Sequence, residues 1–245
     1  MDGLMAVVLG AAMASGPAVS PLDSGTAAVA KAVVAGTDTM NARQYDERTR
    51  FSRTHPNELW RLYGSDAAAH GDWNDAMKHF RQAARYGDKY SQHRISLLYW
   101  HGVGVERDPA LAYAWADLAA ERMYPNFLVL REKMWEHMDP SERDRALREG
   151  QALYDEYGDA AAKPRLKRAL AHEKRQITGS RTGYVGTLEV SAPDGGIDWM
   201  AGIDNIDMTA MYNGWRWDTG KYWAVEDAIW THGNVEVGPV SNGDD

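Results

Sequence analysis

The sequence contains no cysteine among its 245 residues. This absence excludes disulfide bonds, a thiolate nucleophile, cysteine-ligated zinc and a cysteine-linked lipid anchor. Long apolar runs are also missing. The apolar run from Leu4 to Met13 falls short of the roughly 20 residues that a membrane-spanning helix needs, and no other segment comes closer. We therefore expect no membrane span.

Residues 1–20 carry part of the pattern of an export signal. The apolar run is followed by small residues, including Ala12-Met13-Ala14, that are typical of a signal-peptidase site. The basic residues that normally precede such a run are missing, since only Asp2 lies ahead of it. We interpret residues 1–20 as a signal peptide, which predicts a periplasmic or secreted protein. The alternative is a disordered leader on a cytoplasmic protein.

Positive charge is scarce in the C-terminal part of the chain. The net charge is −8, and from Gln176 onward three basic residues stand against eleven acidic ones (3 − 11 = −8), so residues 1–175 balance to zero. A nucleic-acid partner requires clustered Lys and Arg, so we expect none. The one basic cluster lies between Lys163 and Arg175 among apolar residues at helical spacing, which is typical of the solvated face of a helix.

Helix signals are concentrated in the middle of the chain. Residues 56–177 read as successive helices joined by short Gly or Asp-Pro connections, whereas residues 21–55 lack sustained periodicity and are interpreted as a linker. Residues 178–245 are acidic and rich in Gly and Trp, which predicts a small appendage, α+β or irregular, packed on the helices.

Within this appendage the sequence predicts short local elements. Residues Tyr184–Val190 and Asn234–Val240 favour strands, and Asp204–Tyr212 and Tyr222–Trp230 favour short helices.

Two stretches of the helical part repeat at a spacing of 36 residues (108 − 72 = 36). The repeated positions are Asp72, Ala76 and Ala83 in the first stretch and Asp108, Ala112 and Ala119 in the second. A fixed period of this size indicates a solenoid of helical hairpins. In this interpretation the aspartates cap helices and the alanines let neighbouring helices approach closely.

The repeat pattern becomes weaker after Tyr124. Pro125 begins an apolar run, and Asp139-Pro140-Ser141-Glu142 has the order of a helix cap, a proline and a capping-box acid. These signals predict a third, divergent hairpin. A helix from about Lys163 to Ile177 would then cover the end of the stack.

The second repeat resembles a known family. The residues that carry the resemblance are Ile95, Ser96, Tyr99, Gly102, Gly104, Val105, Asp108, Ala112, Trp115, Ala119 and Ala120. They are similar to the Sel-one-like repeat, a relative of the tetratricopeptide repeat, over one full unit. The preceding unit is also recognisable, but its inter-helix loop is shorter and lacks Gly-x-Gly-Val. Together the two units extend the resemblance over about Asn57 to Arg122. It implies a mainly α fold, a short α-solenoid of antiparallel hairpins, and protein or peptide binding through groove side chains.

Catalytic and cofactor motifs do not account for the Gly102-x-Gly104 loop. Gly-x-Gly-x-x-Gly, Gly-Lys-Ser/Thr and Gly-x-Ser-x-Gly are all missing, so the loop is interpreted as the turn of a hairpin. The histidines include no His-Glu-x-x-His pair, and the aspartates do not follow the order of a calcium loop. We predict no catalytic residue, no metal and no cofactor. The favoured interpretation is a protein that is not an enzyme, although the sequence does not decide this.

Three residues on the first helix of the matching unit are candidates for binding a partner. Gln92, Trp100 and His101 lie outside the packing positions of the family and are predicted to face a protein or peptide. The favoured function is a non-enzymatic interaction scaffold or adaptor in a bacterial cell envelope. Neither the partner nor the oligomeric state follows from the sequence.

Tryptophans of the C-terminal segment provide the alternative. Trp215, Trp217 and Trp223 are either a platform for a glycan or a partner, or aromatic residues of a core. As a platform they predict a protein that binds or hydrolyses envelope polysaccharide.

Overall fold

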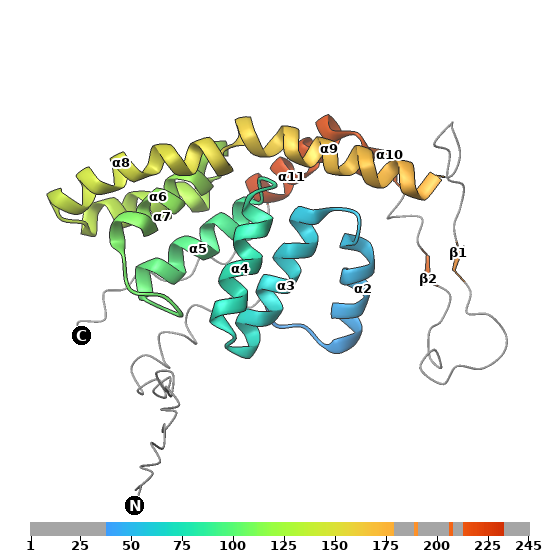
Figure 1. Ribbon diagram of the computed structural model, residues 1–245, viewed down its shortest axis with the longest axis horizontal. Helices are drawn as coiled ribbons and strands as arrows, with labels where there is room; N and C mark the ends of the chain where they lie inside the picture. Colours follow the sequence, from blue (N-terminus) through green and yellow to red (C-terminus); the bar gives the residue numbers. More distant parts are fainter. Residues whose placement is uncertain (1–37, 179–188, 191–205, 208–212, 233–245) are drawn as a thin grey trace, which may run out of the picture.

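The computed structural model describes residues 38–178, 189–190, 206–207 and 213–232, and these residues are mainly helical (Figure 1). The helices are α2 (Ala42–Ser52), α3 (Pro56–His70), α4 (Trp73–Ala84), α5 (Lys89–His101), α6 (Pro109–Ala119), the 3-10 turn η1 (Ala120–Arg122), α7 (Pro125–His137), α8 (Pro140–Tyr157), α9 (Asp159–Thr178), α10 (Gly214–Trp217) and α11 (Thr219–His232). Two short antiparallel strands, β1 (Glu189–Val190) and β2 (Ile206–Asp207), pair Glu189 with Asp207.

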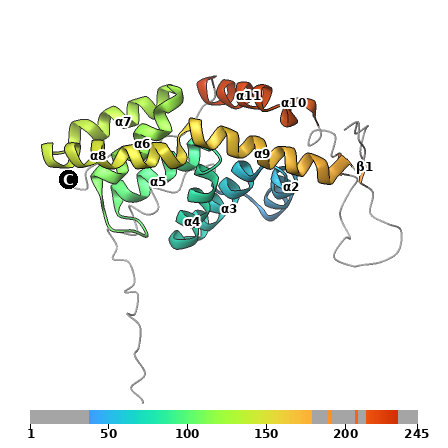
Figure 2. The same ribbon diagram turned by 45° about the horizontal axis from the view of Figure 1, so that its top comes forward.

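Successive helices pack against each other along the chain. Helix α3 contacts α4, α4 contacts α5, α5 contacts α6, and α6 contacts both α7 and α8. Helix α9 then runs back over the stack from α8 and reaches α3, while α10 and α11 lie beside it (Figures 1 and 2). The C-terminal helices are therefore part of the same helical body.

A spacing of 36 residues relates the two middle layers of this stack. Helices α4 and α6 begin 36 positions apart (109 − 73), and α5 and α7 both contain 13 residues and also begin 36 positions apart (125 − 89). The residue that reverses the chain before α5 is Gly87, with φ of 80°, and its counterpart before α7 is Met123, with φ of 61°. The spacing seen in the sequence thus corresponds to a repeated backbone conformation.

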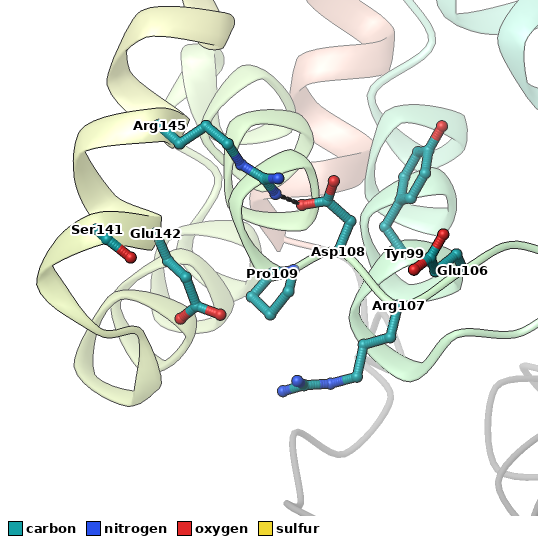
Figure 3. Close-up of a pocket in the computed structure, with 8 residues that line it drawn as sticks. All are labelled: Tyr99, Glu106, Arg107, Asp108, Pro109, Ser141, Glu142 and Arg145. Atoms are coloured by element: carbon teal, nitrogen blue, oxygen red, sulfur yellow. Dashed lines mark hydrogen bonds and ion pairs between the residues drawn. The ribbon is translucent and has the colours of Figure 1, made fainter.

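The loop between α5 and α6 is a hairpin turn, as its glycines predict. Gly102 and Gly104 have φ of 67° and 69°, a region that only glycine adopts without strain. The side chain of Asp108 accepts a 3.0 Å hydrogen bond from the amide of Leu111 and so caps α6. Pro109, next to Asp108, occupies the first turn (Figure 3). The corresponding cap predicted at Asp72 is wrong, because its side chain makes no capping hydrogen bond.

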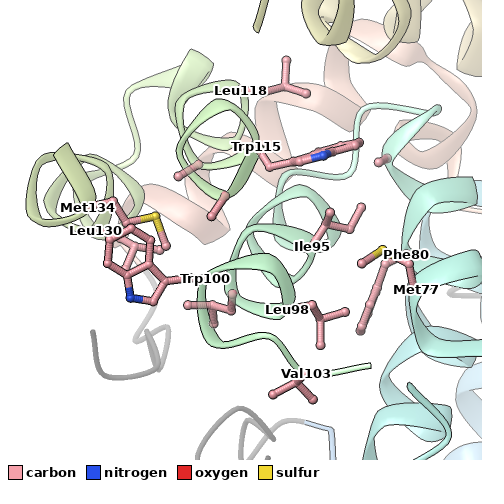
Figure 4. Packing of buried hydrophobic residues seen from close by; sticks show 14 of the residues in the cluster. Met77, Phe80, Ile95, Leu98, Trp100, Val103, Trp115, Leu118, Leu130 and Met134 are labelled. Atoms are coloured by element: carbon pink, nitrogen blue, oxygen red, sulfur yellow. The ribbon is translucent and has the colours of Figure 1, made fainter. Parts of the chain in front are cut away.

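The core lies between α4, α5, α6 and α7. Phe80, Ile95, Leu98 and Trp115 are buried there among alanines (Figure 4). Helix α3 approaches α4 closely at Gly64, where an added Cβ atom would lie 2.5 Å from Cδ1 of Phe80. Small residues at these crossings let the helices approach closely, which is the role that the sequence assigns to its repeated alanines.

Local signals explain most other helix boundaries. Asp139 and Glu142 form a reciprocal capping box at the start of α8, and Pro125 begins α7, as predicted. Helix α9 spans the predicted basic helix but begins earlier, at Asp159. Its basic side chains from Lys167 onward are exposed, whereas Leu166 and Leu170 are buried.

Two differences from the sequence predictions concern the flanking segments. Helix α2 lies within residues 21–55, which are interpreted from the sequence as a linker. It begins with a capping box between Asn41 and Gln44. Ile206 and Asp207 form β2 where a helix is expected, whereas α11 confirms the helix expected at Tyr222–Trp230. Residues 1–20 and the strand expected at Asn234–Val240 lie outside the described residues.

No helix among the described residues is both long enough and apolar enough to cross a membrane.

Replacing Gly104 with Ala should destabilise the protein more than replacing Gly71. Both glycines have positive φ, so both changes introduce backbone strain of about 1 kcal/mol. A Cβ atom at Gly104 would also overlap Trp73, whereas nothing lies within 4 Å at Gly71. We expect an additional loss of about 1 to 3 kcal/mol for Gly104→Ala in urea unfolding. Equal losses for the two variants would contradict the tight packing of this loop on α4.

Replacing Met123 with Gly should stabilise the protein. Met123 holds a left-handed conformation with a side chain that is 65% exposed, so glycine relieves strain and removes little buried surface. We expect the free energy of unfolding to rise by up to about 1 kcal/mol. The gain is limited because glycine also gives the unfolded chain more conformational entropy, which opposes folding. Met123→Ala is the control, because alanine keeps the strain. A gain with alanine as large as that with glycine would show that the backbone conformation is not the cause.

Candidate functional site

Gln92 and Trp100 lie inside the protein, so the expectation that they face a partner is corrected. The side chain of Gln92 is completely buried and donates hydrogen bonds to the carbonyl oxygens of Tyr157 (3.1 Å) and Ala84 (3.4 Å). Trp100 is 2% exposed and lies beside Leu130 and Met134 of α7 (Figure 4). His101, at the end of α5, is half-buried, and its role in binding stays a prediction.

Trp223 belongs to the packing of α11 on the stack. It is 8% exposed, with the guanidinium of Arg122 4.2 Å and the ammonium of Lys163 5.6 Å from its ring. Its predicted role in an exposed glycan or partner platform is therefore corrected. Trp215 and Trp217, on α10, are half-buried. The ring of Trp215 stacks on that of Tyr222, and the rings of Trp217 and His55 pack in a T-shaped arrangement.

Helix α11 crosses the N-terminal ends of α3, α5 and α7. Near its start, the hydroxyl of Tyr222 accepts a 2.6 Å hydrogen bond from Asn57 and donates one of 2.8 Å to Glu58. Near its end, Trp230 stacks on Tyr90 with ring centroids 5.7 Å apart. The ring of Trp230 also lies 5.7 Å from that of Phe127 in α7. Tyr222 and Trp230 are eight residues apart, a spacing that places both on one face of a helix, so a single face of α11 covers the N-terminal ends of α3, α5 and α7.

Half-buried charges hold α10 and α11 against α3. A side-chain nitrogen of Arg216 lies 2.8 Å from Glu58, and Nε2 of His55 lies 3.0 Å from the carbonyl oxygen of Arg216. Burial would raise the pKa of Glu58, but Arg216 and His55 outweigh it and lower that pKa. Burial raises the pKa of Glu226, which lies 3.8 Å from Arg61. These groups are paired with each other, which favours a structural role.

A second network of charges joins α5, η1 and α9. Nζ of Lys89 is completely buried and donates to the carbonyl oxygen of Leu118 (3.0 Å) and to Glu121 (2.6 Å). Arg122 makes two 2.8 Å hydrogen bonds to Asp159. Burial lowers the pKa of Lys89, and nearby carboxylates oppose that change. Each of these charges thus has a partner of opposite sign. The pairs join segments that are distant in the sequence.

The hollow beside the hairpin turn has a volume of about 480 Å³ (Figure 3). It lies between the α5–α6 loop and the start of α8, and its lining residues are Tyr99, Glu106, Arg107, Asp108, Pro109, Ser141, Glu142 and Arg145. Arg145 pairs with Asp108, and Nε of Arg107 donates to the carbonyl oxygen of Trp100 at 3.2 Å. We call this surface the loop hollow.

The loop hollow carries charges of both signs. Glu106 and Arg107 are exposed, and Glu106 makes no hydrogen bond or ion pair with the described residues. Polar groups that donate and accept suit an extended polypeptide, whose backbone offers both kinds of group. The sequence analysis missed this surface because α8 reaches the loop only through the tertiary packing of α6 against α8.

No group of three histidine, aspartate or glutamate side chains suited to a metal ion occurs within the described ranges.

Comparison with protein-family models, with curated proteins and with solved structures finds no match to this chain.

His93 is buried in α5 without the hydrogen bonds that a charged imidazole needs. Its ring stacks on Phe127 with centroids 4.9 Å apart, and its Nδ1 atom has no hydrogen-bond partner. Burial, followed by the positive charge of Arg94, lowers the pKa of His93 to about 3. His93 is therefore neutral in the folded protein at neutral pH.

Acid should destabilise the protein through His93. The unfolded chain takes up a proton on this histidine near pH 6.5, whereas the folded protein does so only near pH 3, so stability falls as the pH drops between these values. Between pH 7 and pH 5 we expect the wild type to lose about 2 kcal/mol more than His93→Leu in urea unfolding. Equal losses for the two proteins would show that His93 is not buried in its neutral form.

Proposed function

We propose that this protein is a helical-repeat scaffold that binds a protein partner, built on hairpins of the Sel-one-like type. The observation that carries the proposal is the repeated layer. Helices of matching length return after 36 residues, each preceded by a left-handed residue at Gly87 or Met123. In such stacks every layer contacts only its neighbours, and side chains left on the surface bind partners. On this proposal the stack is a short α-solenoid.

The partner is proposed to bind at the loop hollow. Gln92 and Trp100 are buried, so the first helix of the layer does not offer them to a partner. The adjacent loop presents exposed Glu106 and Arg107 on the rim of a hollow. The proposed binding surface is thus still next to the Gly-x-Gly-Val turn. It consists of the loop and the start of α8 instead of the first helix of the layer.

A polypeptide partner fits this surface better than a glycan. Trp223 is covered by Arg122 and Lys163, so the three tryptophans do not form one exposed platform. A nucleic acid is disfavoured by the net charge of −8. A periplasmic or secreted location is proposed from residues 1–20 only.

Charge reversal at the loop hollow should weaken partner binding. We expect a photo-cross-linking amino acid at Ser141 to capture one protein in the native host, and Glu106→Lys to reduce its yield at least tenfold. The matched control is Glu136→Lys on α7, which is also an exposed glutamate without a side-chain ion pair among the described residues. Circular dichroism confirms that both variants fold.

Two results contradict the proposal. One is a cross-linking yield that falls equally with Glu106→Lys and Glu136→Lys. The other is the lack of any protein adduct at Ser141 in the native host.

A further inference from the structure

The most unusual side chain in the stack is an arginine in the middle of α5. Arg94 is 1% exposed, and its guanidinium lies 5.6 Å from the centroid of Phe80 and 5.8 Å from that of Tyr90. Burying a charge is costly unless it is paired and hydrogen-bonded. The aromatic rings offset part of this cost, and a carboxylate must supply the rest.

Asp38 supplies that carboxylate from a distant part of the sequence. Its Oδ2 atom lies 2.8 Å from a guanidinium nitrogen of Arg94, and its Oδ1 atom accepts a 3.0 Å hydrogen bond from the hydroxyl of Tyr90. Asp38 is completely buried, whereas Thr39 and Asn41 are exposed and Met40 is half-buried. Asp38 thus ties residues 38–41, which adopt no helix or strand, to the middle of α5.

The site provides more hydrogen-bonding atoms than Asp38 uses. Nε and one terminal nitrogen of Arg94 are buried without a hydrogen-bond partner, although that nitrogen is paired by charge. Each such group costs about 1 to 3 kcal/mol relative to a paired one. An arginine fork binds a carboxylate best through two parallel hydrogen bonds, which this geometry does not provide.

We propose that the Arg94–Tyr90 site is a receptor for an acidic side chain of a partner polypeptide, and that Asp38 occupies it in the absence of that partner. The observation that carries the proposal is the buried arginine, whose guanidinium keeps donors that Asp38 does not use. The inference rests on the proposed scaffold function and adds the chemistry of the bound segment. An aspartate or glutamate in an extended segment would replace Asp38 and complete the two-pronged pairing.

The test restores the acidic group from a separate peptide. The probe is a fluorescently labelled peptide with the sequence of residues 34–42, VAGTDTMNA, and its control carries Asn in place of Asp. Fluorescence anisotropy measures binding to the full-length chain. We expect Asp38→Ala to bind the acidic peptide at least tenfold more tightly than the wild type, because the internal competitor is gone. We also expect it to bind the Asn peptide at least tenfold more weakly than the acidic one.

Three variants separate the site from general effects on the chain. Arg43→Ala alters an exposed side chain of α2 and should bind like the wild type. Asp38→Ala combined with Arg94→Met should lose binding, because the cation is gone and no orphaned charge stays buried. Tyr90→Phe keeps the ring and removes the hydroxyl that holds Asp38, so it should bind with intermediate affinity and serves if Asp38→Ala does not fold.

The inference is overturned by equal binding of the two peptides, by binding that survives the loss of Arg94, or by no binding to a folded Asp38→Ala or Tyr90→Phe protein at millimolar peptide. The cross-link at Ser141 does not involve Arg94. A protein that keeps the cross-link but does not bind the peptide therefore contradicts this site alone, whereas loss of the cross-link contradicts the scaffold function.

Discussion

Burial of α5 on every side is the constraint on which the rest of this structure depends. Lys89, Ser91, Gln92, His93, Arg94 and Ser96 are all buried, although they are polar. Buried polar groups must find partners within the protein or destabilise it. Glu121 of η1 therefore pairs with Lys89, Asp38 pairs with Arg94, and the carbonyl oxygen of Tyr157 accepts from Gln92. These contacts connect α5 to segments that precede and follow it by many residues, so the stack depends on its central helix.

The same constraint decides where a partner can bind. A helix covered by α11 and by Asp38 presents little surface of its own, so the exposed chemistry of this layer lies in the adjoining loop and at the start of α8. Where α5 does hold a strong recognition group, at Arg94, the chain itself occupies it. The proposed scaffold thus has an open surface at the loop hollow and an internally occupied one at Arg94.

The sequence predicts local features well and long-range burial badly. The turn at Gly102 and Gly104, the cap at Asp108 and the capping box at Asp139 follow from backbone sterics and hydrogen bonding within a few residues. Burial of Trp100 depends instead on α7. Position in a repeat therefore does not identify exposed residues when other segments cover the stack. Helix α2 did have a local signal, the pair Asn41 and Gln44, which its weak apolar periodicity hid.

Hydrogen–deuterium exchange of the full-length chain tests the central claim most directly. If α5 is enclosed on all sides, amides from Tyr90 to Leu98 exchange only through global unfolding and are the slowest in the protein. Amides of α2, most of whose side chains are exposed, exchange orders of magnitude faster. Exchange in α5 as fast as in α2 would contradict the enclosure of α5 and the role of its buried charges.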